Sequence, residues 1–482
     1  ALYNYLLAKK HGGTFILRIE DTDQTRYVEG AEQYIIDALE WLGLEFDESP
    51  AKGGPHGPYR QSERKATGIY KKFAEQLIAN GHGYYAYDTE DELKAVRAAA
   101  EAQGTKFKYD AVTRMQMKNS LTLSKQECAD LVSKGAPEIV RVMIPGQGNV
   151  TFNDMVRDAV TFDCSEMDDK VMLKNDGMPT YHLANIVDDY HMKITHVVRG
   201  EEWLPSTPLH VLLYQFLGWG DAMPVFAHLP LILKPDGKGK LSKRDGEKMG
   251  FPVFPLSWNE SVGYKEAGYF PEAVVNFLAM LGWNEGTEQE IYSLQELINA
   301  FSLERVNKSG ARFDPDKTKW FNQQYLQTKS DAELAELFVP ILENETPNYV
   351  RDDKKEEKVV SLIKERATFV SDFWELSNYF YVAPTSYAEK AVKKQWKEGT
   401  PEILNQLVSV LQGIDLFSSE NVENIVKKWI SEQELSFGKV MPPLRLVLVG
   451  DMKGPHVFDI MALLGKDECL DRINKAIAQL GG

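Results

Sequence analysis

The sequence predicts a multidomain protein in which an α/β domain, split by an α+β insertion, precedes an all-α C-terminal domain. Strand-like and helical patterns alternate in residues 14–80 and again from residue 171, as in parallel α/β sheets. The pattern changes between residues 81 and 162, and after Lys248 helical periodicity dominates. At about 150 residues per domain, the length of 482 residues suggests about three domains.

The first part of the chain alternates between helix and strand patterns. Apolar residues from Leu2 to Leu7 have helical spacing, and basic residues followed by Gly12-Gly13 end that helix. A run of strand formers follows, and Asp21 and Asp23 then offer helix-capping side chains. We expect, in order, a strand at 14–20, a helix at 31–42, a Gly/Pro-rich loop at 53–60 and a helix at 62–79.

Between residue 81 and the return of the α/β pattern near residue 171, helical and strand-like segments no longer alternate regularly. An Ala/Glu/Lys-rich helix and two strand-like pieces separated by a Pro-Gly turn predict a mixed insertion. The closing segment predicts two helices joined at Gly465. We expect a helix at 91–103, strands at 139–144 and 150–152, strands at 171–174, 195–200 and 228–233, and a helix at 209–217.

Composition and charge exclude several classes of protein. Hydrophobic residues make up 43% and charged residues 26%, which is ordinary globular composition, and no apolar run is long enough to cross a bilayer. The three cysteines lie far apart, so we expect neither a disulfide framework nor a cysteine-based zinc site. A net charge of −16 speaks against nucleic acid as a partner, unless local basic patches form the binding surface.

A basic segment follows a glycine-loosened turn. Lys240-Leu241-Ser242-Lys243-Arg244 comes directly after Pro235-Asp236-Gly237-Lys238-Gly239. Several cations on such a loop suit an enzyme that transfers phosphate, because lysine can follow the charge that develops on a leaving phosphate. A basic surface loop is the alternative interpretation of the same residues.

Acidic side chains follow the first predicted strand. Ligands of open parallel sheets lie beyond the carboxyl ends of the strands, and Glu20 falls at such an end, where it can accept hydrogen bonds from an ammonium group. Capping alone explains Asp21 and Asp23. Arg26 follows closely.

A third group of polar residues surrounds a later strand end. Tyr181 and Asn185 are four residues apart and share a face if they are helical. Arg199 closes a strand-like run and can clamp a carboxylate with two parallel hydrogen bonds. A salt bridge from Arg199 to Asp188 is the alternative. The histidines have no metal-site spacing, and no Ser/His/Asp triad or P-loop is present.

Taken together, these segments resemble the bacterial-type glutamyl-tRNA synthetases, which are class I aminoacyl-tRNA synthetases with a Rossmann-like catalytic domain. The lysine segment is similar to the family's KMSKS signature, with Leu241 in place of methionine. The resemblance covers essentially the whole chain. Its other matching stretches are residues 12–23, 53–64, 181–185, 198–203 and 458–465.

The resemblance implies ATP-dependent ligation of L-glutamate to tRNA(Glu) through a glutamyl-adenylate, with Mg²⁺ on the phosphates of ATP. Glu20 would hold the α-amino group of glutamate and Arg199 a carboxylate, with Tyr181, Asn185 and Arg26 shaping the pocket. A guanidinium facing the side-chain carboxylate would reject glutamine. Glu202 and Lys243 would contact ATP. Lys240, Ser242 and Lys243 would stabilise the phosphates during adenylate formation.

The resemblance also implies a domain plan. Residues 1–80 and 171–250 would form the catalytic domain, 81–170 the insertion that handles the acceptor end of tRNA, 251–322 a stem-contact domain and 323–482 the helical anticodon-binding domain. Arg366 would favour the glutamate anticodon over that of glutamine. Many relatives carry zinc in the insertion, but here it holds only Cys128 and Cys164, so we expect no metal site.

Two alternatives stay open. One is a non-discriminating enzyme that also charges tRNA(Gln). The other is a tRNA-binding protein without activity, because the family's HIGH signature belongs ahead of the first helix and we expect this chain to lack it, together with the first strand. We expect tRNA(Glu), L-glutamate and ATP as partners, no membrane, a monomer and a cytoplasmic location.

Overall fold

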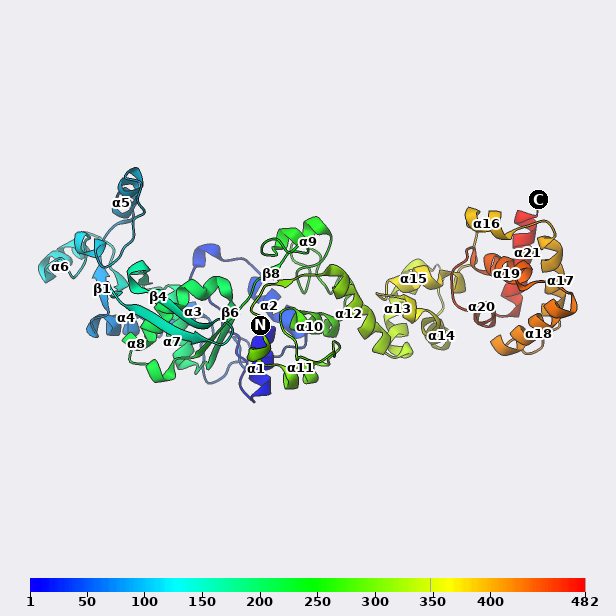
Figure 1. Cartoon of the computed structure of the whole chain (residues 1–482), viewed down its shortest axis with the longest axis horizontal. Coiled ribbons are helices and arrows are strands. Elements are labelled where there is room, and N and C mark those ends of the chain that lie inside the picture. Colours follow the sequence, from blue (N-terminus) through cyan, green and yellow to red (C-terminus); the bar gives the residue numbers. More distant parts are fainter. Residues whose placement is uncertain (347, 482) are drawn as a thin grey trace. The chain divides into compact units, whose positions relative to one another are not determined.

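The computed structural model describes residues 1–346 and 348–481, which form two compact units (Figure 1). One unit comprises Ala1–Leu256 and Val275–Asp314, and the other comprises Ser257–Val274 and Pro315–Gly482. The first holds all the described strands, whereas the second is helical among its described residues. An α/β region followed by an all-α region is therefore confirmed.

Three sheets form in the first unit (Figure 1). Their orders are β1-β2-β5, β4-β3-β7-β6 and β8-β9. Within the four-stranded sheet β3, β7 and β6 run parallel, while β4 is antiparallel to β3. The strands are β1 (Gly83–Ala86), β2 (Ile139–Val142), β3 (Asn149–Asp154), β4 (Asp158–Asp163), β5 (Val171–Leu173), β6 (His196–Gly200), β7 (Val225–Leu229), β8 (Ile232–Leu233) and β9 (Ala311–Arg312).

Several helices of the first part of the chain begin at a polar residue whose side chain caps the helix. The Thr89 side chain, for example, accepts from the N–H of Glu92, whose carboxylate accepts from the N–H of Thr89 in return. The helices of this part of the chain are α1 (Leu2–Lys10), α2 (Ala31–Trp41), α3 (Gln61–Lys65), α4 (Ile69–Ala79), α5 (Glu90–Ala102), α6 (Lys125–Ser133), α7 (Tyr181–His191), α8 (Thr207–Phe216), α9 (Lys243–Met249), α10 (Pro271–Met280) and α11 (Leu294–Ala300).

The later helices follow each other with short connections. Ser330 and Glu333 form a capping box at α13, and Gly465, at φ 82°, joins the last two helices as predicted. They are α12 (Pro315–Thr328), α13 (Asp331–Glu345), α14 (Asp353–Ile363), α15 (Asp372–Ser377), α16 (Glu389–Gln395), α17 (Thr400–Gln412), α18 (Ser419–Glu432), α19 (Phe437–Val449), α20 (Val457–Leu464) and α21 (Lys466–Leu480).

Two short 3₁₀ segments carry predicted site residues of the first unit, and a third lies in the second unit. They are η1 (Gln24–Arg26), η4 (Glu201–Ser206) and η7 (Lys364–Arg366). None of the helices in the described part of the chain is long and apolar enough to span a membrane.

The hydrophobic core of the first unit packs α4, α7 and α8 against the strands. Tyr70, Leu183, Leu213 and Phe226 are buried in this one cluster. Burying each such side chain contributes roughly 1.5–3 kcal/mol. The core therefore fixes the N-terminus of α7 and the ends of β6 and β7, where the predicted site residues lie.

The predicted strand at 14–20 is irregular. Its bridges are single and parallel, from Ile16 to Glu48 and from Ile19 to Arg60. Its neighbours are extended parts of loops rather than strands, so no continuous ladder forms. Likewise, the helix predicted at 62–79 is two helices, because Gly68 between them adopts φ 75°, a left-handed conformation that ends a helix.

Strand partners also differ from the sequence interpretation. The strand at residues 150–152, interpreted as part of the insertion, is β3 of the sheet that holds β6 and β7. Conversely, β5, interpreted as the return of the α/β sheet, pairs antiparallel with β2. The compact units also divide the predicted interval 251–322. The functional domain boundaries therefore stay predictions.

Candidate active site

Arg18 joins three polar residues, two of which come from a distant part of the sequence. Its Nη1 donates to Oδ1 of Asp189 at 2.8 Å. Its Nη2 donates to Oε1 of Glu20 at 2.9 Å and to Oδ1 of Asn185 at 2.8 Å. Two predicted site residues, Glu20 and Asn185, are thus held by one guanidinium.

The electrostatics of this group keep Glu20 available. Burial raises the pKa of Asp189, and the charge of Arg18 opposes that rise. Asp189 is the buried counter-ion of Arg18, with a side chain that is 6% exposed. The Glu20 side chain is 38% exposed and shares Arg18 only through one oxygen. Its other oxygen can accept from a bound ammonium group.

Arg199 lies near the end of β6, and none of its hydrogen-bond partners carries a negative charge. Its Nε donates to Nε2 of His228 at 3.2 Å, its Nη1 to the Tyr181 hydroxyl at 2.9 Å and its Nη2 to Oγ1 of Thr207 at 2.9 Å. Among the described residues no carboxylate lies within ion-pair distance of Arg199. The alternative salt bridge to Asp188 is wrong, because Asp188 is buried against Arg64 at 2.7 Å.

Tyr181 connects the arginine to the rest of the site. It begins α7, and its ring lies 4.7 Å from that of Trp203. Burial raises the pKa of Tyr181, the charge of Arg199 lowers it and the charge of Glu20 raises it. Both charged residues are therefore near its hydroxyl. Tyr181 and Asn185 share one face of a helix, as predicted.

Behind Arg199 lies a buried pair that sequence reasoning missed. Nδ1 of His228 lies 2.6 Å from Oδ2 of Asp154, and both side chains are fully buried. Burial alone would raise the pKa of Asp154, but hydrogen bonds from His228 and backbone N–H groups lower it below its usual value. Arg199 and His228 are register partners on neighbouring strands, and such pairing across strands has no local sequence signal.

The basic loop contacts the segment that follows β6. Nζ of Lys240 lies 2.8 Å from Oε1 of Glu202, and this bond lowers the pKa of Glu202. The Ser242 hydroxyl donates to Oδ2 of Asp245 at 2.5 Å as the cap of α9. Lys243 lies over the ring of Phe254 at 5.0 Å.

Two predicted site residues are not brought to this group. Arg26, on η1, is 86% exposed and pairs with Asp23 at 3.0 Å. Arg366 lies on η7 in the second compact unit. Two histidines near Arg199 face each other: Nδ1 of His182 lies 3.1 Å from Nε2 of His210, and burial lowers the pKa of His182 to about 4. The described residues contain no group of three or more metal-ligating side chains.

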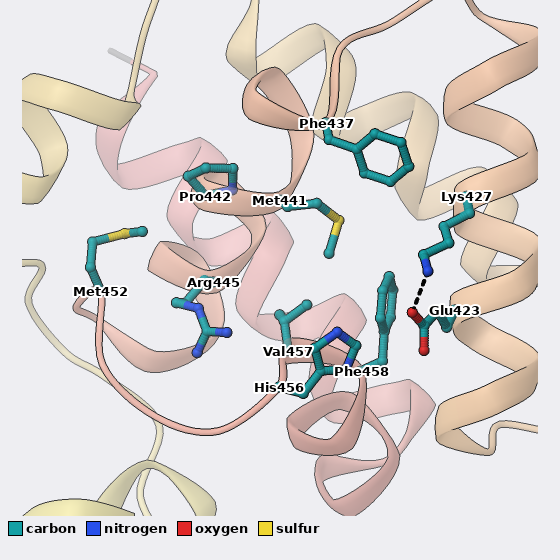
Figure 2. Close-up of a pocket in the computed structure, with 10 residues that line it drawn as sticks. All are labelled: Glu423, Lys427, Phe437, Met441, Pro442, Arg445, Met452, His456, Val457 and Phe458. Carbon is teal, nitrogen blue, oxygen red and sulfur yellow. Dashed lines mark ion pairs between the residues drawn. The ribbon is translucent and has the colours of Figure 1, made fainter.

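The second unit holds a cavity of about 310 Å³ between α18, α19 and α20 (Figure 2). Phe437, Met441, His456 and Phe458 line it together with Arg445. An ion pair of 2.6 Å between Lys427 and Glu423 forms one side. Burial lowers the pKa of Arg445, and the positive charge of Arg366 lowers it further. Arg366 therefore lies near this cavity.

Residues 1–320 match the family model described as tRNA synthetases class I (E and Q), catalytic domain. Residues 333–477 match the model of an anticodon-binding domain. The chain is 56% identical over its full length to a glutamate–tRNA ligase of Flavobacterium psychrophilum, of which it covers 95%. The chain belongs to the bacterial glutamate–tRNA ligase family. The fold class and the family predicted from the sequence are thereby confirmed.

Other members of the ligase family agree. A glutamate–tRNA ligase of Bacteroides fragilis is 53% identical over the whole chain, which covers 95% of its length. The solved structure of a glutamate–tRNA ligase from Elizabethkingia meningosepticum, in complex with its amino acid, has a TM-score of 0.95 at 49% identity. It matches 99% of this chain, which covers 95% of it. The ligase of Elizabethkingia anophelis gives a TM-score of 0.92 at the same identity and coverage.

Proposed function

We propose that this chain ligates L-glutamate to tRNA(Glu), with glutamyl-adenylate as the intermediate. The observation that carries the proposal is the guanidinium of Arg199, which is held by three side chains, none of them negatively charged. A buried or half-buried arginine is normally paired with a carboxylate. In the complex with substrate, a carboxylate of the bound glutamate pairs with Arg199.

The pocket supports selection of glutamate by charge. Glu20 accepts hydrogen bonds from the substrate's ammonium group, and Arg199 pairs with a carboxylate. Tyr181 and Asn185 lie between them and set the distance at which the two charged ends are held. Glutamine would place a neutral amide against the guanidinium, where its NH₂ group faces N–H donors, so it binds poorly. Arg26 adds positive charge when the exposed η1 segment contacts the ligand.

Two reactions follow at this site. An oxygen of the substrate's α-carboxylate attacks the α-phosphorus of ATP, and pyrophosphate leaves with the electrons of the broken P–O bond. The 2′-hydroxyl of the terminal adenosine of tRNA then attacks the carbonyl carbon, and AMP leaves. Lys240, Ser242 and Lys243 stabilise the charge that develops on the leaving phosphates. Glu202 holds Lys240 near the site in the absence of ATP and then contacts the nucleotide.

Mg²⁺ supplies further neutralisation of phosphate charge when it is bound with ATP. Its main donors would be phosphate oxygens and water, because Mg²⁺ bound with a nucleotide keeps much of its hydration shell. We propose no zinc site, since Cys164 is buried and Cys128 lies on a different element.

The helical unit serves tRNA selection. Arg445 and the aromatic residues of the cavity in Figure 2 suit an unstacked base, which stacks on rings and accepts from a guanidinium. Arg366 lies near Arg445, and their mutual repulsion is relieved by an electron-rich partner. We propose that Arg366 favours the anticodon of tRNA(Glu). The insertion and the segment 251–322 would contact the acceptor end and the stem.

We propose that the ligase is a monomer and that it works in the cytoplasm, where tRNA is charged.

The test is the amino-acid requirement of charging. The protein is incubated with ATP, tRNA(Glu) and either glutamate or glutamine. We expect charging with glutamate and at least about 100-fold less with glutamine. Equal charging with both amino acids would contradict the pocket assignment. Charging of tRNA(Gln) with glutamate at a similar rate would establish the non-discriminating alternative.

A further inference from the structure

Three neighbouring parallel strands place Asp154, His228 and Arg199 in a row at one edge of the sheet. Asp154 is the last residue of β3. His228 is the last residue but one of β7, and Arg199 is the last residue but one of β6. The order of these strands in the sheet is β3-β7-β6. The carboxyl ends of parallel strands form the edge at which ligands bind. The row therefore runs from the buried core to the proposed glutamate site.

The hydrogen bonds fix the proton of the His228 ring. Nδ1 faces Oδ2 of Asp154 at 2.6 Å, and a carboxylate oxygen only accepts. Nε2 receives the N–H of Arg199 Nε at 3.2 Å, so Nε2 holds a lone pair. A neutral ring with its proton on Nδ1 satisfies both contacts. The other tautomer would set an N–H of the ring against the N–H of Arg199.

Asp154 itself is locked by the backbone. Its Oδ1 accepts the N–H of Val156 at 3.0 Å and of Arg157 at 2.9 Å, and it also accepts the N–H of His228 at 3.2 Å. Three donors converge on Oδ1, so the carboxylate cannot turn, and Oδ2 alone faces the ring. Asp154 is 3% exposed and His228 is 0% exposed.

We propose that Asp154 and His228 are positioning residues: Asp154 keeps the ring proton on Nδ1, and Nε2 then holds the guanidinium of Arg199 where a carboxylate of glutamate reaches it. The inference rests on the proposed binding of glutamate by Arg199. It deepens that function, since neither residue touches the substrate. Thr207 completes the support, because its Oγ1 accepts from Nη2 of Arg199 and lies 3.0 Å from Nε2 of His228.

Asp154→Asn tests this with little change of shape. The three backbone donors still require an oxygen at the Oδ1 position, so the new NH₂ group takes the place of Oδ2. It then faces Nδ1, which must become the acceptor, and the ring proton moves to Nε2. That proton opposes the N–H of Arg199. An aspartate-to-asparagine change that inverts a histidine tautomer in this way is severe in serine proteases.

Two readouts are measured on the full chain, namely the ¹⁵N spectrum of the histidine rings and the Kd values for L-glutamate and ATP. His228→Gln identifies the His228 signals. We expect Nδ1 protonated in the native chain and Nε2 protonated in Asp154→Asn. We expect the Kd for L-glutamate to rise about 10- to 100-fold in that variant, while the Kd for ATP changes less than about twofold.

Asp110→Asn is the matched control. Oδ1 of Asp110 accepts the N–H of Val112 and of Thr113, both at 3.0 Å, in the same kind of turn but without a histidine. It should change neither readout. A native ring protonated on Nε2 overturns the inference, and so does an inverted ring with an unchanged Kd for L-glutamate.

Arg199→Ala separates this inference from the proposed function. If Arg199→Ala raises the Kd for L-glutamate and Asp154→Asn does not, only the positioning role fails. If Arg199→Ala leaves the Kd for L-glutamate unchanged, the glutamate site is misplaced, and the proposed function and the positioning role fail together.

Discussion

Nζ of Lys240 lies 2.8 Å from Oε1 of Glu202, so an ion pair connects the basic loop to the segment that follows Arg199. Both side chains are largely exposed, at 56% and 45%. Ion pairs this exposed contribute about 0–1 kcal/mol. The phosphates of ATP carry more charge than one carboxylate and can displace Glu202. The loop is thus held near the site without being locked there.

Lys243→Ala should slow adenylate formation severely. If Lys243 donates to the phosphates in the transition state, its loss raises the barrier by about 2.5–4 kcal/mol. Single-turnover formation of glutamyl-adenylate measures this directly. Lys238→Ala is the control, since Lys238 is an exposed lysine of the preceding turn. Near-normal turnover of Lys243→Ala would remove this lysine from the mechanism.

Arg199→Ala should raise the KM for glutamate far more than the KM for ATP. A lost charged hydrogen-bond partner costs about 1.5–3 kcal/mol, which is about 10- to 100-fold in affinity. The KM values are measured in the charging reaction, with Arg97→Ala on the exposed surface of α5 as control. An equal effect on both substrates would show that Arg199 supports the fold of the site and does not bind glutamate.

Arg366→Gln should weaken the preference for tRNA(Glu) over tRNA(Gln). A guanidinium–base contact contributes about 1–3 kcal/mol to discrimination, so the ratio of kcat/KM values should fall about 5- to 150-fold. Charging of both tRNAs is compared in the native chain and the variant. Lys364→Gln, on the same 3₁₀ turn but paired with Asp331 at 2.7 Å, is the control. An unchanged ratio would assign discrimination to other residues.

Binding of tRNA should weaken steeply with salt even though the chain carries a net charge of −16. Four phosphate contacts would reduce the affinity about 100-fold between 50 and 200 mM salt. Filter binding or fluorescence anisotropy over that range measures the slope. A flat response would mean that contacts to phosphate play little part, as the overall charge alone would suggest.

Stability should fall between about pH 6.5 and pH 4 through His182. Burial lowers its folded-state pKa to about 4, whereas an exposed histidine titrates near 6.5. The unfolded state binds more protons in this window, so up to about 3 kcal/mol of stability present above pH 6.5 is lost on acidification. His182→Gln should flatten the pH dependence of the urea midpoint, although His210 beside it keeps part of it. His11→Gln, on the surface, should leave that dependence unchanged.

Local patterns predicted the elements that local chemistry decides. The helix α2 ends just before Gly43, and α20 and α21 meet at Gly465, as the spacing and the glycines indicated. The helix expected at 91–103 forms as α5, one residue earlier at each end. The neighbours of each strand are not local. The apolar pattern of β5 fits a strand in either of the two larger sheets, so only tertiary packing decides that it pairs with β2. The sequence did not predict β4, the antiparallel partner of β3. Its side chains are exposed or only partly buried, so it lacks the buried apolar side chains that mark a strand.

The candidate site divides in the same way. Glu20 and Arg199 follow strand-like runs, so their positions at strand ends could be predicted, and the family resemblance gave them roles. Arg18 lies inside the stretch 12–23 that resembles the family, but its contacts with Asn185 and Asp189 join residues about 170 positions apart. No local pattern marks Asp154 and His228 as site residues, because only the strand order β3-β7-β6 brings them next to Arg199.

The most direct test of the proposed ligase is charging of tRNA(Glu) in the presence of ATP, with and without L-glutamate. We predict that glutamyl-tRNA forms and that its formation requires both ATP and L-glutamate. If the protein binds tRNA(Glu) but forms no glutamyl-tRNA, the ligase assignment is contradicted and a tRNA-binding protein takes its place.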